Sequence, residues 1–130
     1  MSTTAIPTTR IDVQEVRLRC GGDELQAVLS VPAPAAGVVL FAHGSGSGRH
    51  SSRNRQVAQA LNRAGLATLL LDLLTQHEEA VDRFTARHRF DIDMLTRRFE
   101  DATAWAGAQA ALRGLPLRYF GARSGSAVAL

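Results

Sequence analysis

The sequence predicts an α/β protein, a three-layer α/β/α sandwich built on a mostly parallel sheet. A continuous apolar run of strand length, 38–42, and a second predicted buried strand, 66–71, flank a segment whose apolar residues have helical spacing. An apolar run without alternation is typical of a strand covered on both faces. A third such strand, 117–120, follows a long amphipathic stretch. Strands that alternate with helices form parallel sheets through right-handed crossovers.

Length and composition fit a single folded domain. The 130 residues are 45% apolar and 21% charged, so one core can form without disulfide or metal. All 15 basic residues are arginine, which excludes Schiff-base catalysis, pyridoxal phosphate anchoring and a Walker-type phosphate loop. Cys20 is the single cysteine, which fits a reducing compartment and no Cys-rich zinc site.

The chain shows no feature of a membrane or nucleic-acid protein. No apolar run approaches the roughly 20 residues that cross a bilayer, and no signal-peptide pattern precedes the domain. The net charge is only +3, which is weak support for nucleic-acid binding. We therefore expect a cytoplasmic protein that binds a small-molecule substrate, with no cofactor and no metal ion.

The N-terminal part predicts a tail and a hairpin. Residues 1–12 are expected to be a flexible tail, and the domain is expected to span 13–130. Strands at 13–19 and 25–31 flank a turn at Gly21-Gly22-Asp23.

A loop at 32–37, with two prolines, leads into the first buried strand. The helix that follows is expected to begin after a cap at Ser51 or Ser52 and to end before Gly65, which suits a left-handed C-terminal cap. Its expected apolar face comprises Val57, Ala60, Leu61 and Ala64.

Segment 75–90 carries mixed charge and predicts a partly helical excursion with a surface ion-pair network. A long helix is expected from an Asp91 cap to Leu112, and Gly114 and Pro116 stop it. Its covering face is expected to comprise Ile92, Leu95, Phe99, Ala102, Ala106 and Gln109, with Trp105 near the same stripe.

Two glycine-rich turns follow buried strands, at 43–48 and 121–126. Ligands of open α/β sheets bind at the carboxyl ends of the strands, where backbone amides and helix N-termini point outward. In α/β enzymes that cleave acyl bonds, one such turn carries a nucleophile on a tight elbow and the other an oxyanion-hole amide. The backbone amides of Ser45 and Gly125 are the candidate donors.

Ser124 is the candidate nucleophile, because the small residues Ala122 and Ser126 flank it at the two crowded positions of an elbow. A second register, 121–125, has better glycines but puts Arg123 at the nucleophile position. Arginine cannot attack a carbonyl, so the alternatives are a serine elbow and a turn that has lost its nucleophile.

Candidate substrate-binding residues surround these turns: His43, Gly44, Arg49, His50 and Arg123. His43 is either a polar member of the oxyanion loop or a histidine that tethers the loop to the backbone. Arg49 and His50 near the helix start would attract an anionic substrate. The alternative is a solvated basic helix face, which includes Arg53, Arg55 and Arg63. Asp72 ends a strand at the same edge and is expected to cap a loop.

Three segments resemble a known family: Phe41–Ser51, Gly65–Thr75 and Arg89–Asp93. They look like the dienelactone hydrolase-like α/β-hydrolases, some of which are fused to phosphoribosyltransferases. The resemblance covers nearly all of the chain from about Val13. It implies an incomplete α/β-hydrolase fold and the hydrolysis of small esters, lactones or related acyl compounds through an acyl-enzyme.

The elbow of this family commonly has the sequence Gly-Ala-Ser-Thr-Gly, which aligns without a gap with residues 121–125. In this alignment Arg123 stands at the position of the family's serine. Dienelactone hydrolases proper use an elbow cysteine, whereas Cys20 lies on an early strand, so thiol catalysis is not carried over. The triad acid and histidine follow the nucleophile in this class, and the six residues after Ser124 contain neither. We therefore expect a fragment or a natural truncation with little or no esterase activity, which self-associates through its exposed last strand.

Two other classes of protein remain open. A glycine-rich loop followed by Asp72 about 24 residues on is similar to a dinucleotide-binding fingerprint, although Arg49 stands where a small residue is required. The other alternative is a non-catalytic relative that keeps the fold as an interaction protein.

Overall fold

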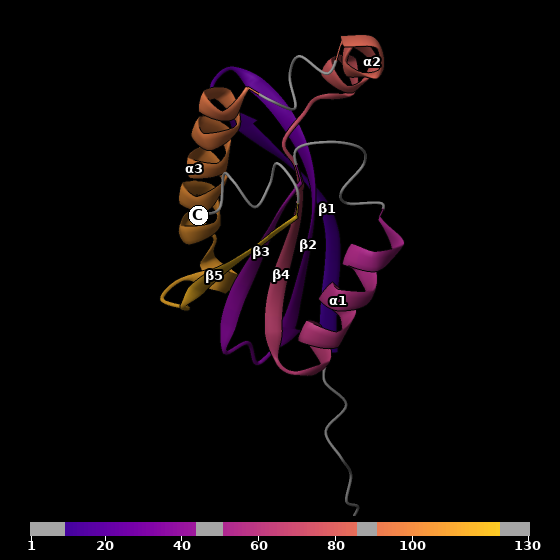
Figure 1. Ribbon diagram of the computed structural model, residues 1–130. Helices are drawn as coiled ribbons and strands as arrows, with labels where there is room; N and C mark the ends of the chain where they lie inside the picture. Colours follow the sequence, from indigo (N-terminus) through magenta and orange to yellow (C-terminus); the bar gives the residue numbers. More distant parts are fainter. Residues whose placement is uncertain (1–9, 44–50, 86–90, 123–130) are drawn as a thin grey trace, which may run out of the picture.

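The protein is an α/β sandwich with a five-stranded sheet, seen in a computed structural model that describes residues 10–43, 51–85 and 91–122. Figure 1 shows α1 against one face of the sheet and α3 against the other, so the expected three layers are confirmed. The elements are β1 (Arg10–Cys20), β2 (Asp23–Ala33), β3 (Gly37–His43), α1 (Ser52–Arg63), β4 (Leu66–Asp72), α2 (Gln76–Thr85), α3 (Ile92–Ala108), the 3₁₀ helix η2 (Ala110–Leu112) and β5 (Leu117–Ala122).

The strand order is β1-β2-β4-β3-β5. Strand β3 is parallel to β4 and to β5, whereas β2 is antiparallel to both of its neighbours. Four strands therefore point the same way and β2 opposes them. The predicted α/β class is confirmed, with a sheet that is mixed because a hairpin forms one side of it.

The β1–β2 hairpin turns at Gly21 and Gly22, whose φ angles are 59° and 93°. Positive φ is accessible to glycine at little cost, which explains the tight two-residue turn. Strand β1 begins at Arg10, paired with Ala33, so residues 10–12 lie in the sheet and not in the expected tail.

The expected loop at 32–37 is shorter than predicted, because Pro32 and Ala33 belong to β2 and Gly37 to β3. Strand β4 pairs only with residues 27–30 of β2. Beyond them no strand among the described residues pairs with β2 on that side, so that Pro32, which has no N–H, is tolerated there.

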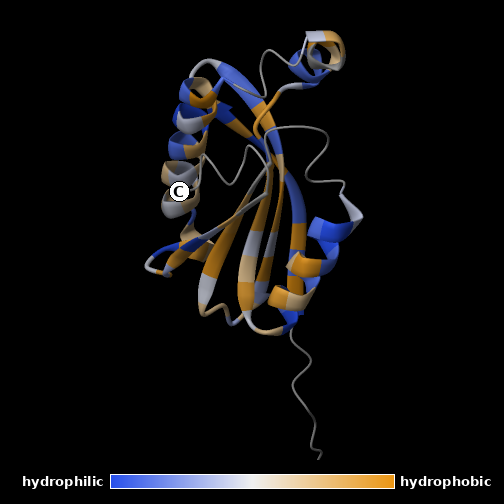
Figure 2. Cartoon of the chain, viewed as in Figure 1, coloured by the Kyte–Doolittle hydropathy of each residue, from blue (hydrophilic) through white to orange (hydrophobic). Residues whose placement is uncertain are grey.

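Alternation along the strands divides the core between the two faces of the sheet. Leu69 and Leu71 belong to the large cluster on the α3 side, whereas Leu70 belongs to a small cluster with Phe41 and Ala58 on the α1 side. Figure 2 shows the apolar residues concentrated in the strands between these helices. The α1 face is thus the more thinly covered of the two.

Helix α1 begins as predicted: the Ser51 hydroxyl accepts a hydrogen bond from the Asn54 amide at 3.3 Å. Gly65, with φ 91°, follows its end. The expected apolar face is wrong at Ala60 and Ala64, which are exposed.

Asn62 is a polar residue on the buried face of α1. Its side-chain amide donates to the Leu66 carbonyl at 2.9 Å and to the Thr68 hydroxyl at 3.2 Å. Buried polar groups need such partners, and Thr68 on β4 supplies one. The helix is therefore rotated so that Asn54, Ala58 and Asn62 face the sheet.

Helix α3 begins at the predicted cap, since the Asp91 carboxylate accepts a hydrogen bond from the Met94 amide at 3.1 Å. Four residues of the predicted face are buried, namely Leu95, Phe99, Ala102 and Ala106. Ile92 is 40% exposed, contrary to the prediction, because it lies in the first turn. The α-helix ends at Ala108, four residues before the predicted end, because Gln109 adopts an extended conformation.

Candidate functional site

Three parallel strands end together at one edge of the sheet. In the register of the sheet, His43 at the end of β3 pairs with Asp72 of β4 on one side and with Ala122 of β5 on the other. The two glycine-rich segments therefore leave the sheet from adjacent strands at the same level. This is the arrangement that a nucleophile elbow and an oxyanion loop require.

Most of the predicted site residues lie outside the described part of the chain: Gly44, Ser45, Arg49, His50, Arg123, Ser124 and Gly125. For His43 the structure describes the backbone, as the last residue of β3. The predictions for these side chains and amides stay predictions. What the structure adds is the common origin of the two segments that contain them.

Asp72 is the last residue of β4 and is 3% exposed. A carboxylate at this depth is stable only with polar partners, and Asp72 does interact within the molecule. The expectation that Asp72 caps a loop stays a prediction.

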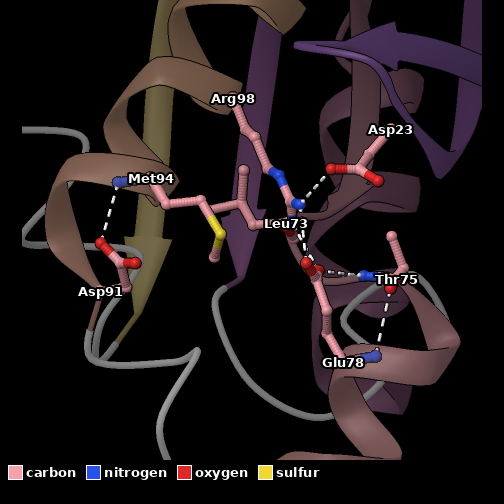
Figure 3. Close-up of polar contacts among 7 residues, drawn as sticks. All are labelled: Asp23, Leu73, Thr75, Glu78, Asp91, Met94 and Arg98. Carbon is pink, nitrogen blue, oxygen red and sulfur yellow. Dashed lines mark hydrogen bonds and ion pairs between the residues drawn. The ribbon is translucent and has the colours of Figure 1, made fainter.

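A buried arginine, Arg98, contacts several segments of the chain near Asp72 (Figure 3). Arg98 of α3 donates from Nη1 to the Leu73 carbonyl oxygen at 2.8 Å. Its Nη2 donates to Glu78 Oε2 at 2.8 Å and to Asp23 Oδ2 at 3.0 Å, and Nη1 also donates to Glu78 Oε1. One guanidinium thus joins α3, the start of α2, the hairpin turn and the residue after Asp72.

Two of the three charged side chains in this cluster are largely buried. The Arg98 side chain is 5% exposed and that of Glu78 14%, while Asp23 is 56% exposed. The hydrogen bond with Glu78 raises the pKa of Arg98 above its ordinary value, against the lowering effect of burial. Arg98 therefore stays charged, and its bidentate pairing with Glu78 compensates for lost hydration.

Glu78 also forms hydrogen bonds that cap the start of α2. Its Oε1 accepts from the Thr75 amide at 2.9 Å, and its own amide donates to the Thr75 hydroxyl at 3.1 Å. This reciprocal pair is a capping box. The predicted surface ion-pair network is wrong at Glu78, because that carboxylate turns inward to Arg98.

Arg98 is not among the residues predicted for the buried face of α3, because that prediction uses apolar residues alone. Arg98 stands three residues after Leu95, on the buried side of the helix. The Thr-x-x-Glu pattern at Thr75 and Glu78 marks a helix start that the sequence also contains. Together these two signals could have placed a buried arginine near an acidic cap.

Cys20 lies in the core with 1% exposure. Burial and, to a smaller extent, the Asp101 charge raise the pKa of its thiol to about 11, while the Arg98 charge acts in the opposite direction. Because the thiolate is the nucleophile, this cysteine is unreactive at neutral pH. This environment fits the expectation that thiol catalysis is not carried over.

Within residues 10–43, 51–85 and 91–122, no three His, Cys, Asp or Glu side chains form a group that could hold a metal ion. In the same part of the chain, none of the helices has the length and hydrophobicity to cross a bilayer.

Comparison with solved structures finds the same fold in hydrolases. Dienelactone hydrolase from Anabaena variabilis is 47% identical with a TM-score of 0.85, and the match covers 92% of this chain and 55% of that one. A dienelactone hydrolase-like promiscuous phosphotriesterase from metagenomic libraries is 18% identical with a TM-score of 0.70, covering 92% and 52%. Est1E from Butyrivibrio proteoclasticus is 16% identical with a TM-score of 0.69, covering 88% and 42%.

Comparison with curated proteins finds two from Mycobacterium tuberculosis strains, both provisionally named phosphoribosyl transferases. Each is 46% identical over 117 residues, which is 90% of this chain and 26% of the relative. The chain thus spans about a quarter of the length of these relatives and about half of the dienelactone hydrolase. No protein-family model matches the sequence.

These matches, together with the strand order and the shared edge of β3, β4 and β5, define the chain as an α/β-hydrolase fold. Its structural neighbours are dienelactone hydrolase and dienelactone hydrolase-like proteins, matched over their N-terminal part. The resemblance seen in the three sequence segments is confirmed.

Proposed function

We propose that this chain belongs to a serine hydrolase that cleaves small esters, lactones or related acyl compounds through an acyl-enzyme. The observation that supports it is the pairing of His43 with Ala122, from which the two glycine-rich segments depart side by side. The hydrolase neighbours, which include a dienelactone hydrolase at 47% identity, favour the same chemistry.

In the proposed mechanism, the Ser124 hydroxyl attacks the acyl carbon and the carbonyl oxygen becomes an oxyanion. The backbone amides of Ser45 and Gly125 donate hydrogen bonds to that oxyanion, which lowers the barrier by preorganised electrostatics. The leaving group departs, and water then hydrolyses the acyl-enzyme. The general base that takes the serine proton is not assigned to a residue of this chain.

Substrate binding is proposed for His43, Gly44, Arg49, His50 and Arg123, which flank the two segments. The arginines would attract substrates that carry a negative charge near the acyl group. Small anionic esters or lactones are therefore the substrate class that this set of residues favours.

A non-catalytic relative is the second candidate, favoured by a specific feature of the elbow. In the ungapped register of the family motif, Arg123 takes the position of the nucleophile. In that case the fold would serve an interaction, and Ser124 would be an ordinary turn residue.

Labelling with a fluorophosphonate, followed by peptide mass spectrometry, separates the two candidates. We expect one adduct on Ser124 in the protein expressed from its full native reading frame, lost in Ser124→Ala and kept in the neighbouring control Ser126→Ala. No adduct on Ser124, with the protein folded, would leave the non-catalytic relative as the better assignment.

A further inference from the structure

A groove beside α1 lies apart from the candidate site. It has a volume of about 540 Å³ and is bounded by β1 and β2 on the sheet side and by α1 on the other. Figure 1 shows these three elements next to one another. Arg63, the last residue of α1, lines one end of it shortly before β4 begins. That end therefore faces the amino edge of β4, away from the strand ends at Asp72.

The floor of the groove is apolar. Val28 and Leu70 are partners in the β2–β4 register and lie side by side on the α1 face. Ile11 and Val13, two positions apart on β1, extend this surface beyond the reach of α1. They are 36% and 60% exposed, which is a costly placement for two neighbouring β-branched apolar residues. Apolar side chains that line a groove together are typical of small-molecule sites.

The wall formed by α1 is basic. Arg55 and Arg63 both line the groove, and their spacing of eight residues puts them on the same side of the helix. The acidic residue in the lining is Glu15 on β1. Arg63 has no ion-pair partner within the described residues, whereas Arg55 already has an interaction within the molecule. The Arg63 guanidinium is therefore the cation that an anionic ligand in the groove would meet.

We propose that this groove binds an amphipathic carboxylate of the fatty-acid class. The hydrocarbon chain lies on Ile11, Val13 and Val28, and the carboxylate is held by the guanidinium of Arg63. Arginine suits this role because its planar fork can donate two parallel hydrogen bonds to a carboxylate. The volume falls within the roughly 300–1,000 Å³ of known small-molecule sites. The proposal is independent of the proposed hydrolase function.

The test is isothermal titration of the protein with sodium decanoate below its micelle concentration. We expect saturable binding of one decanoate per chain. Decyltrimethylammonium, which has the same chain and the opposite charge, is expected to bind at least about tenfold more weakly, because the Arg63 guanidinium repels it.

Variants assign the binding to the groove. Arg63→Glu and Val13→Asp are each expected to weaken decanoate binding about tenfold or more, by loss of the cation and of the apolar floor respectively. Arg53→Glu is the matched control, since it makes the same charge change on an exposed part of α1 that does not line the groove. All three positions are exposed, and circular dichroism checks that each variant is folded.

The proposal is overturned if decanoate does not saturate, if the cationic amphiphile binds as well, or if Arg53→Glu weakens binding as much as Arg63→Glu. A dimer that Val13→Asp dissociates, without decanoate binding, would also overturn it and would assign the groove to a second copy of the chain.

Discussion

The Arg98 side chain connects α3 to three other parts of the chain. Its partners are Asp23 at the start of β2, the Leu73 carbonyl after β4, and Glu78 of α2. A guanidinium with 5% exposure is stable there because both of its terminal nitrogens donate to acceptors. The cluster is therefore sensitive to the loss of any one member.

Replacing Arg98 with methionine tests this sensitivity. We expect Arg98→Met to lower the free energy of unfolding by about 3 kcal/mol, because Glu78 is left largely buried without its cation. Urea denaturation measures the change. Arg97→Met is the matched control: its side chain is exposed, and a change within about 0.5 kcal/mol is expected. Equal losses in both variants would show that the cluster contributes nothing particular.

The raised pKa of Cys20 predicts that the stability of the protein depends on pH. Its pKa is raised from 9.0 to about 11, mainly by burial. Between these pH values the unfolded chain has lost the thiol proton and the folded chain has kept it, so stability falls as pH rises through this window. Below pH 9 the contribution is fully present.

Urea denaturation at several pH values from 8 to 11 measures this slope, with Cys20→Ala as the reference that cancels other titrating groups. The wild-type protein is expected to lose more stability over the window than the variant. Parallel curves for the two proteins would contradict the assigned pKa.

At the scale of elements, α1 is oriented by a polar contact. Asn62 bridges the end of the helix to Leu66 and Thr68 at the start of β4. The apolar residues that the spacing predicted for this face, Ala60 and Ala64, are exposed instead. The buried Asn62 amide and the apolar contacts of Ala58 thus together set which side of α1 faces the sheet, and with it the position of Arg55 and Arg63 at the groove.

We expect Asn62→Ala to destabilise the protein by about 1–3 kcal/mol, because the Thr68 hydroxyl loses its donor in a site with no exposure. Thermal or urea unfolding measures the loss. Gln56→Ala, at an exposed position of the same helix, serves as the control. A loss confined to about 0.5 kcal/mol in Asn62→Ala would show that water or neighbouring groups replace the contact.

The helix starts and turns show how well local patterns can be predicted. Ser51 and Asp91 cap their helices as expected, Gly65 has the predicted positive φ, and Gly21 and Gly22 form the predicted turn. These features depend on a few neighbouring residues. The extent of β1 and β2 was underestimated, because Arg10 and Ala33 extend the ladder by pairing across the hairpin.

At the scale of the whole molecule, β5 lies at one end of the strand order. Within the described residues no strand pairs with its outer edge, and Tyr119 and Phe120 are 44% and 41% exposed. Exposed strand edges with apolar side chains pair with other chains. We propose that the 130-residue chain self-associates through β5.

Sedimentation velocity over a range of concentrations tests this proposal. We expect association that increases with concentration and that Tyr119→Lys weakens, because a charge on an edge strand opposes pairing. Val13→Lys, on the strand at the opposite end of the sheet, is expected to leave it unchanged. A chain that stays monomeric at every concentration would contradict the proposal.

The sequence by itself determined the α/β class, the order of the elements and the common edge of the two glycine-rich segments. Apolar runs, caps and glycines act over a few residues, and parallel strands place their carboxyl ends together. Only the tertiary structure decided that Arg98 meets Asp23 and Glu78, that Asn62 turns α1, and that Ile11 and Arg63 border one groove. Such contacts join residues far apart in the chain. They depend on the strand order and on the rotation of each helix, which no local pattern specifies.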